Sequence, residues 1–150
     1  MEDFTKFKSW FDSQINTGLH LDKDILFVGN TVYSPENCVF VPCWVNSCLI
    51  LTTQKKTTGL PIGVSTQKDR PLKNYKGFIN ANNSRIYLGR FERALDAHKA
   101  WQWAKAEYIE GVVHRYASEE CFRTDVAEAL TQRVWKLRLD YSTGTETLSL

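Results

Sequence analysis

Apolar residues recur at helical spacing near the start of the chain. Five of them are spaced three, three, one and four residues apart: Phe4, Phe7, Trp10, Phe11 and Ile15. This spacing predicts an amphipathic helix over 4–17 that ends at Gly18 and buries its aromatic side chains. A second apolar run with helical character follows at 45–51.

Apolar and polar residues alternate with a period of two in three later segments, which predicts strands with one buried and one open face. The segments are 64–67, 75–80 and 85–88. Asn82-Asn83 between the last two is a suitable hairpin tip, because asparagine tolerates positive φ. A long helix over 94–117 is expected to cover the inner face, with Trp101 in the core and Trp103 either exposed or packed on the 4–17 helix.

The segment between the first helix and these strands contains short β-prone runs and turn signals. We expect a strand over 19–28, a turn at Gly29-Asn30, a short return at Val32-Tyr33, a turn over 34–37 and a strand over 38–41 that Pro42 ends. After the 94–117 helix, a further helix is expected over 119–139 and a frayed tail over 142–150.

These elements predict an α+β fold. We expect an N-terminal helix and a ββα unit at 1–53, a basic linker at 54–60, a three-stranded antiparallel sheet on a long helix at 61–117, and a C-terminal helix with its tail at 118–150. No apolar run approaches the roughly 20 residues of a membrane helix, and no signal peptide is evident. We therefore expect a cytoplasmic protein.

Positive charge is concentrated in one part of a nearly neutral chain. The net charge is +2, but residues 54–93 hold nine Lys or Arg and two acidic residues, a local net charge of +7. Such a zone is typical of polyanion binding. The alternative interpretation is a solvated loop with ordinary lysines.

Cysteine and histidine spacing gives little indication of a zinc site. Cys38, Cys43 and Cys48 are five residues apart, Cys121 is distant, and no pair is separated by only two residues. We expect reduced thiols in a cytosol. His98 and His114 are too far apart on one helix to share a metal and are expected to be packing or surface residues.

The segment 61–109 resembles the AP2 DNA-binding domain. The similarity rests on Gly63-Val64, on Tyr75 with Gly77 and Ile79, on Leu88-Gly89-Arg90-Phe91, and on Ala97-His98 with Ala100-Trp101. The resemblance implies a three-stranded sheet that lies in the major groove of DNA. The composition of this sheet favours modest, salt-sensitive affinity.

The segment 19–50 resembles the HNH nuclease unit that accompanies AP2 domains in bacteriophage homing-endonuclease-like proteins. The matching segments are 20–24, 32–42 and Val45-Asn46. The family carries Asp-His where this chain has Asp22-Lys23, so the HNH unit is degenerate. Protonated lysine neither accepts a proton nor binds metal well near pH 7. If the unit is active, His20, Asp22 and Asn37 would be catalytic, and Asp22 and Asp24 would hold Mg²⁺ or Mn²⁺.

Alternation assigns the outward face of the predicted sheet. Its members are Ser65, Gln67, Lys76, Phe78, Asn80, Arg85 and Tyr87. Arg85 is suited to guanine, Asn80 and Gln67 to adenine, and Phe78 and Tyr87 to thymine methyl groups or sugars. Basic residues around the face would contact phosphates: Lys55, Lys56, Lys68, Lys73 and Arg90. An ordinary exposed strand pair is the alternative for Arg85 and Tyr87.

Three functions remain open from the sequence. The first is a sequence-preferring double-stranded DNA-binding protein of phage type, with nuclease activity lost or weak and no cofactor needed for binding. The second is an active, metal-dependent HNH endonuclease. The third is a phage protein that binds and inhibits a host protein through an apolar patch, which the aromatic content (five Trp, eight Phe, six Tyr) would allow.

Overall fold

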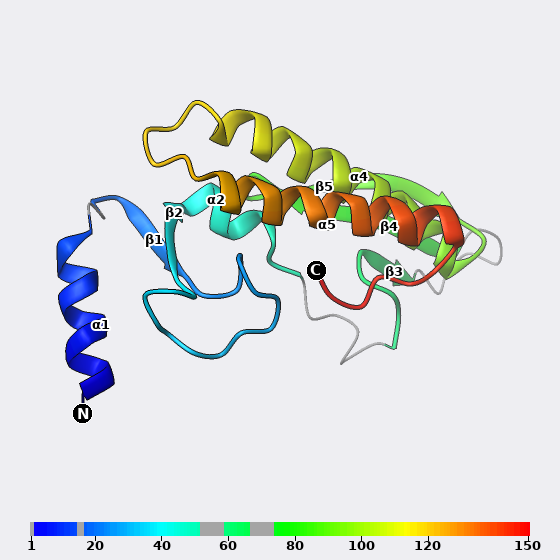
Figure 1. The fold of residues 1–150 in the computed structure, drawn as a ribbon. Helices are drawn as coiled ribbons and strands as arrows, with labels where there is room; N and C mark the ends of the chain where they lie inside the picture. The colour runs from blue at the N-terminus through cyan, green and yellow to red at the C-terminus, as the bar shows by residue number, and fades with distance from the viewer. Residues whose placement is uncertain (1, 15–16, 52–58, 67–73) are drawn as a thin grey trace.

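The protein has an α+β fold with two small antiparallel sheets (Figure 1). The computed structural model describes residues 2–14, 17–51, 59–66 and 74–150. The N-terminal elements are α1 (Glu2–Ser13), β1 (Leu19–Asp22), β2 (Val39–Pro42) and α2 (Cys43–Cys48). The later elements are β3 (Val64–Thr66), β4 (Tyr75–Ala81), β5 (Ser84–Phe91), α4 (Ala94–Tyr116) and α5 (Thr124–Thr143). None of these helices combines the length and the apolar character that crossing a bilayer requires.

The first sheet and α2 form a ββα unit. β1 pairs antiparallel with β2, with Leu19 opposite Pro42 and Asp22 opposite Val39. β1 is shorter than the strand predicted over 19–28, because Asp22 turns the chain. Its Oδ1 accepts hydrogen bonds from the backbone N–H groups of Asp24 and Ile25, both at 2.7 Å.

The connection between β1 and β2 is an ordered loop. The Asn30 amide donates to the carbonyl oxygens of Lys23 and Val32, both at 2.8 Å, so one side chain joins two parts of the loop. The predicted turns at Gly29-Asn30 and 34–37 are present. The short return strand predicted at Val32-Tyr33 is not formed, and both side chains are more than half exposed.

Helix α1 contacts β2 through aromatic side chains. Trp10 stacks on Phe40 with ring centroids 5.6 Å apart, and Phe11 meets the same ring edge-on at 5.2 Å. The prediction that the aromatic side chains of this helix pack is therefore confirmed for its C-terminal half, whereas Phe4 is 72% exposed.

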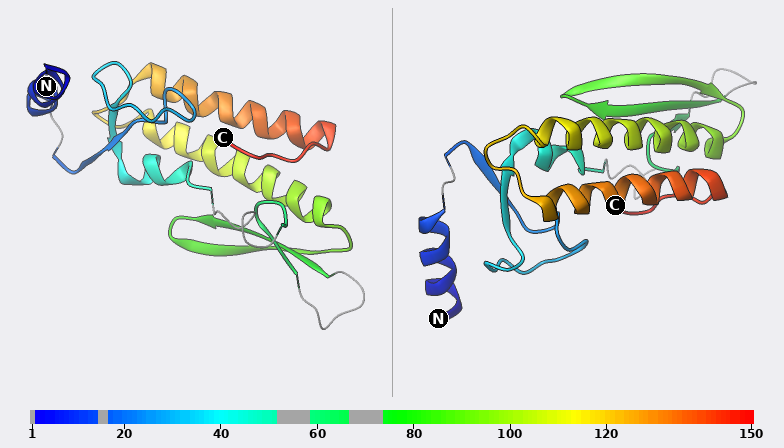
Figure 2. Two further views of the ribbon diagram at one scale, coloured as in Figure 1. Left: turned by 90° about the horizontal axis from the view of Figure 1, so that it is seen from below. Right: turned by 45° about the horizontal axis from the view of Figure 1, so that its top comes forward.

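The rest of the chain forms three layers, with the β3–β4–β5 sheet on one side of α4 and α5 on the other (Figure 2). The sheet is antiparallel, and β4 is the central strand. The hairpin tip is where the sequence predicts it, since Asn82 and Asn83 have φ values of 51° and 59°. One hydrophobic core joins the ββα unit to these layers, from Ile25, Val39 and Val45 to Ile109 and Leu130.

A close contact fixes the start of the sheet on α4. Gly63 has φ +76°, and a Cβ atom there would lie 2.3 Å from the Trp101 ring. Only glycine fits both the conformation and the space. Trp101 is 3% exposed, which confirms its predicted place in the core. Trp103, in contrast, is 51% exposed and packs on Tyr141 of α5, not on the first helix.

The C-terminal tail is docked, so the prediction that it frays is wrong. Thr147 is fully buried, and its backbone N–H donates to His98 Nε2 at 3.0 Å. His98 Nδ1 lies 2.8 Å from the Ile62 carbonyl oxygen, which fixes the neutral Nδ1–H tautomer. Gln102 donates to the Thr145 carbonyl and to the Thr147 hydroxyl. The polar composition of the tail therefore serves a buried hydrogen-bond network.

Lys105 is a buried cation at the junction of α4 with the ββα unit. Its side chain is 2% exposed, and its Nζ is 3.4 Å from the Ile50 carbonyl oxygen just beyond α2. Burial lowers the pKa of this ammonium below its ordinary value of 10.5. Burial also raises the pKa of the nearby Cys48 thiol to about 12, so this neighbour stays neutral near pH 7.

We expect Lys105→Met to raise the free energy of unfolding by about 1–3 kcal/mol at pH 7, because the buried charge disappears and the apolar stem remains. A lowered pKa penalises the folded state only while the amine is charged. The gain should therefore shrink as pH rises toward 10.5. Urea unfolding at a series of pH values measures this gain in the free energy of unfolding. The exposed Lys6→Met should change stability by less than about 0.5 kcal/mol. A destabilised Lys105→Met protein would contradict the expectation.

Candidate nucleic-acid interface

The strand register brings a set of polar and aromatic residues to the sheet face opposite α4. Three cross-strand rows form it: Ser65, Lys76 and Arg90; Phe78 and Tyr87; Asn80 and Arg85. Asn80, Arg85 and Tyr87 are exposed, and Ser65, Lys76 and Arg90 are partly exposed. We call these seven residues the open face. Its predicted members therefore lie together wherever the structure describes them.

A β-bulge adds Arg90 to this face. Gly77 pairs with Gly89 and Phe78 with Tyr87, so Leu88 is an extra residue in β5. A bulge shifts the side-chain alternation by one residue. Leu88 keeps the α4 side that alternation from Ile86 gives it, whereas Arg90 is moved to the open face, opposite Lys76.

Phe78 differs from its sequence expectation. Its ring is 4% exposed, so it does not offer a surface for thymine methyl groups. The Arg85 guanidinium lies 3.6 Å from the centroid of this ring, in cation–π geometry. Phe78 is therefore a support for Arg85. No hydrogen bond or ion pair of Arg85 is found among the described residues, so its planar donor edge remains open to solvent.

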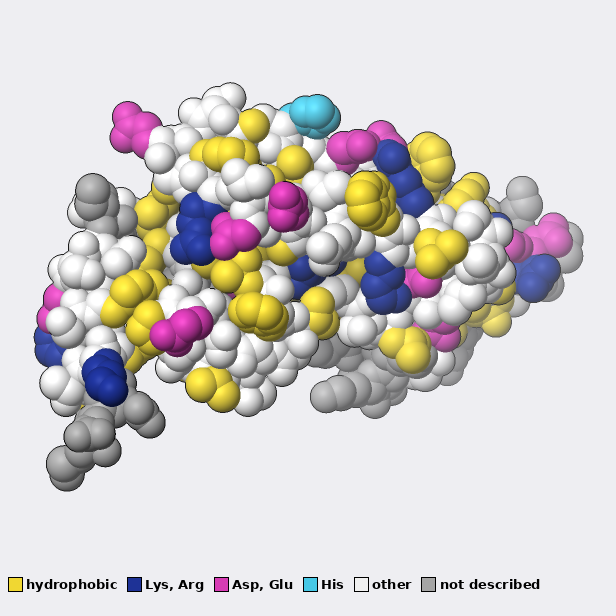
Figure 3. All heavy atoms as spheres, viewed as in Figure 1, with side chains coloured by type: hydrophobic (Ala, Val, Ile, Leu, Met, Phe, Trp, Pro, Cys, Tyr) yellow, Lys and Arg dark blue, Asp and Glu magenta, His cyan; other side chains and the backbone are white. Residues whose placement is uncertain are grey.

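The charge on the described part of the open face has one sign. Lys76, Arg85 and Arg90 contribute three positive charges, and no acidic residue belongs to the rows. Figure 3 views the molecule from the α5 side, where basic and acidic side chains are interspersed. Five predicted DNA contacts lie outside the described residues: Lys55, Lys56, Gln67, Lys68 and Lys73.

The ββα unit carries the residues predicted for catalysis. His20 is exposed in β1 opposite Val41, two residues before Asp22 on the same side of the strand. Asn37 closes the turn before β2, where its backbone N–H donates to the Ser34 carbonyl. The Lys23 ammonium lies 2.6 Å from Asp24 Oδ1 and 3.0 Å from the Asn30 carbonyl oxygen. The hydrogen bond to Asp24 raises the pKa of Lys23, which keeps this side chain cationic.

The donor set fits a divalent cation poorly. Asp22 Oδ1 already accepts two backbone hydrogen bonds, and the cationic Lys23 is paired with Asp24. Among the described residues, no three His, Cys, Asp or Glu side chains are grouped as a metal site would require. The visible role of Asp22 is to turn the chain after β1.

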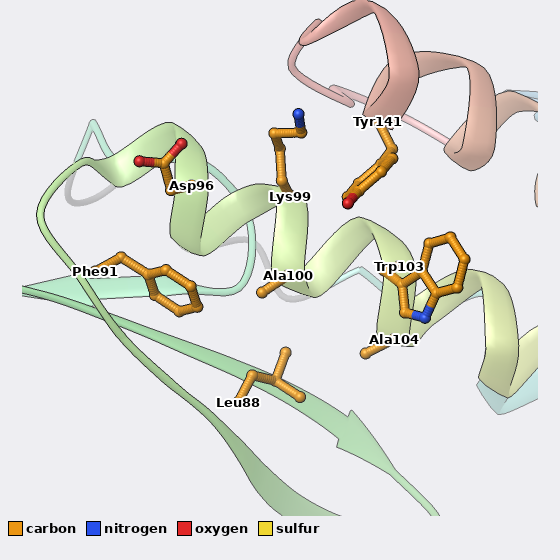
Figure 4. A pocket seen from close by; sticks show the side chains of 8 residues that line it. All are labelled: Leu88, Phe91, Asp96, Lys99, Ala100, Trp103, Ala104 and Tyr141. Carbon is orange, nitrogen blue, oxygen red and sulfur yellow. The ribbon is translucent and has the colours of Figure 1, made fainter.

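A groove unforeseen from the sequence lies on the other side of β5 (Figure 4). It has a volume of about 590 Å³ between β5, α4 and α5. Figure 4 shows Leu88 and Phe91 pointing from β5 toward Ala100 and Ala104, with Trp103 beside Tyr141. This groove faces away from the open face. The lining is mostly apolar and also includes Asp96 and Lys99.

Comparison of the chain with models of protein families, with curated proteins and with solved structures finds no match.

The two aspartates of the ββα unit should differ in their effect on stability. We expect Asp22→Ala to lower the free energy of unfolding by about 1–3 kcal/mol, because two backbone donors lose their acceptor. Asp22→Asn should retain most of this stability, since an amide oxygen also accepts. Asp24→Ala should change it by less than about 1 kcal/mol, because the Asp24 carboxylate is exposed and its pair with Lys23 is partly solvated. Denaturant unfolding compares the three variants. Equal effects of the two alanine substitutions would contradict a structural role for Asp22.

Proposed function

We propose that this chain is a double-stranded DNA-binding protein that reads the major groove with its open face. The observation that carries the proposal is a sheet face with three basic residues, an exposed tyrosine and an exposed amide, and no acidic member among its described residues. The major groove is about 12 Å wide and admits a β-ribbon. The resemblance to AP2 domains of phage proteins supports the same mode of binding.

Arg85 has the central role in this mode. A guanidinium reads guanine through two parallel hydrogen bonds to O6 and N7. Stacking on Phe78 restricts the orientation of the Arg85 guanidinium and leaves its edge exposed. Less conformational freedom is then lost on binding.

The remaining residues of the open face have complementary roles. Asn80, opposite Arg85, is suited to adenine N6 and N7, and Tyr87 is suited to a thymine methyl group or a sugar. Lys76 and Arg90 lie where they would contact phosphates. With the basic residues of 55–73, roughly 4–6 phosphate contacts would give a slope of log K against log[salt] of about −4 to −5.

We propose that the ββα unit is a scaffold and not an active nuclease. In an HNH mechanism a histidine takes a proton from water, and a metal ion stabilises the leaving oxygen. Here Lys23 stands at the expected histidine position and pairs with Asp24, while Asp22 accepts backbone hydrogen bonds. The second interpretation, an active endonuclease using His20, Asp22 and Asn37, is decided by a cleavage assay.

The DNA-binding proposal predicts a strong effect of removing two positive charges from the open face. Arg85→Ala with Lys76→Ala should weaken duplex binding by at least about tenfold in an electrophoretic shift assay, since a base contact and a phosphate contact are lost. The control is Lys6→Ala with Arg138→Ala, which removes equal charge from the exposed sides of α1 and α5. Unchanged binding by the open-face double variant would end this assignment. A complex with a host protein that forms without DNA and survives the Arg85 change would favour the third interpretation.

The scaffold proposal predicts no strand cleavage. Supercoiled plasmid incubated with the folded protein and Mg²⁺ or Mn²⁺ should stay intact under conditions in which the shift assay shows binding. Nicking that disappears in His20→Ala or Asp22→Asn would instead establish the endonuclease. Asp22→Asn is informative because it should keep the turn after β1.

A further inference from the structure

A second cavity lies at the end of the open face. It has a volume of about 460 Å³ and is bounded by α2, the β4–β5 turn and one residue of α4. Both views in Figure 2 place α2 beside this turn. The lining residues are Cys43, Trp44, Ser47, Ile50, Asn80, Ala81, Asn82, Asn83 and Tyr108. We call this cavity the tip pocket.

The lining of the tip pocket is neutral, aromatic and amide-rich. Trp44 and Tyr108 offer aromatic surface, three asparagines offer amides, and Ser47 offers a hydroxyl, and none of the described residues in the lining is charged. A phosphate would find no cation among the described residues of this lining. A planar, neutral ligand with several donors and acceptors fits it well, and a nucleobase has this chemistry.

The walls of the tip pocket are held in place from outside. The Tyr108 hydroxyl lies 3.4 Å from the Asn82 backbone N–H and 3.5 Å from Asn82 Oδ1, where α4 meets the hairpin tip. The Arg115 guanidinium lies 4.0 Å from the Trp44 ring and restricts the indole. Asn82 and Asn83 both have positive φ, which fixes the tight turn between them.

The tip pocket adjoins the proposed DNA surface. Asn80 belongs to both, and it pairs with Arg85 across the sheet. DNA that lies along the open face and continues past the β4–β5 turn would then reach the pocket, which Tyr108 lines from the α4 side. We propose that the tip pocket takes one unpaired nucleobase of the bound DNA, stacked on aromatic surface and hydrogen-bonded by the asparagine amides. This inference rests on the DNA-binding function proposed above.

The test compares three duplexes of one sequence by fluorescence anisotropy. One is fully paired, one carries a single unpaired base, and one carries an abasic nucleotide at the same bulge. The base-containing bulge should bind about tenfold more tightly than the other two, since base–aromatic stacking is favourable for every base. The abasic bulge has similar flexibility without a base, so a preference for both bulged duplexes would show that bending is recognised and would overturn the inference.

Cys43 offers a way to block the tip pocket after folding. It is exposed and lines the pocket, whereas Cys38 and Cys48 are buried. Alkylation with N-ethylmaleimide should abolish the preference for the unpaired base and leave affinity for the paired duplex within about twofold. Cys43→Ser protein treated in the same way should keep the preference, which controls for reaction at the half-buried Cys121.

A substitution in the turn gives an independent readout. Asn83→Gly removes an amide from the lining and suits the positive φ of 59° at this position. It should reduce the preference for the unpaired base by at least about threefold without weakening the paired duplex. If the preference for the unpaired base survives both the alkylation and Asn83→Gly, the inference about the tip pocket is overturned, while the proposed DNA-binding function stands. Failure of all three duplexes to bind would overturn the DNA-binding function with it.

Discussion

The fold depends on the burial of α4 on two sides. One side packs against the sheet through Ala97 and Trp101, and the other packs against α5 and the ββα unit. A helix buried in this way cannot place all of its polar residues in solvent, so His98, Gln102 and Lys105 need partners inside the protein. The C-terminal tail and the segment after α2 supply them. The same helix therefore sets the position of the sheet, the tail and the ββα unit relative to one another.

This arrangement explains why one face of the sheet stays open. With α4 on the inner face, the hydrophobic requirement of a three-stranded sheet is met. The outer face is then available for side chains that a core would exclude. Phe78 is the exception, since it is apolar on the outer face. Arg85 covers its ring. The apolar Phe78 side chain is therefore buried, while the charged guanidinium of Arg85 above it stays exposed.

Local patterns were sufficient to predict much of this structure. Alternation predicted the three strands, Asn82-Asn83 marked the hairpin tip, and the helix expected over 94–117 is α4 within one residue. Long-range contacts could not be predicted in the same way. Thr147 is buried because of His98 and Gln102, which are more than 40 residues away, so its polar composition alone suggested a frayed end. Likewise, alternation gives the direction of Phe78 but not the Arg85 side chain that covers it. The tip pocket combines α2 with a turn that lies more than 30 residues later, and no local motif indicates it.

The hydrogen bonds within the ββα unit are also consistent with a structural use of this segment. A strand that presents a histidine and a carboxylate to a metal must keep their oxygen and nitrogen lone pairs available. In this chain Asp22 uses one oxygen to close a turn, and Lys23 neutralises Asp24 while it holds the loop through the Asn30 carbonyl. What the unit supplies to the rest of the molecule is α2, which packs on α4 and stands beside the hairpin tip. The unit therefore contributes one wall of the tip pocket, where it places Trp44 and Ser47.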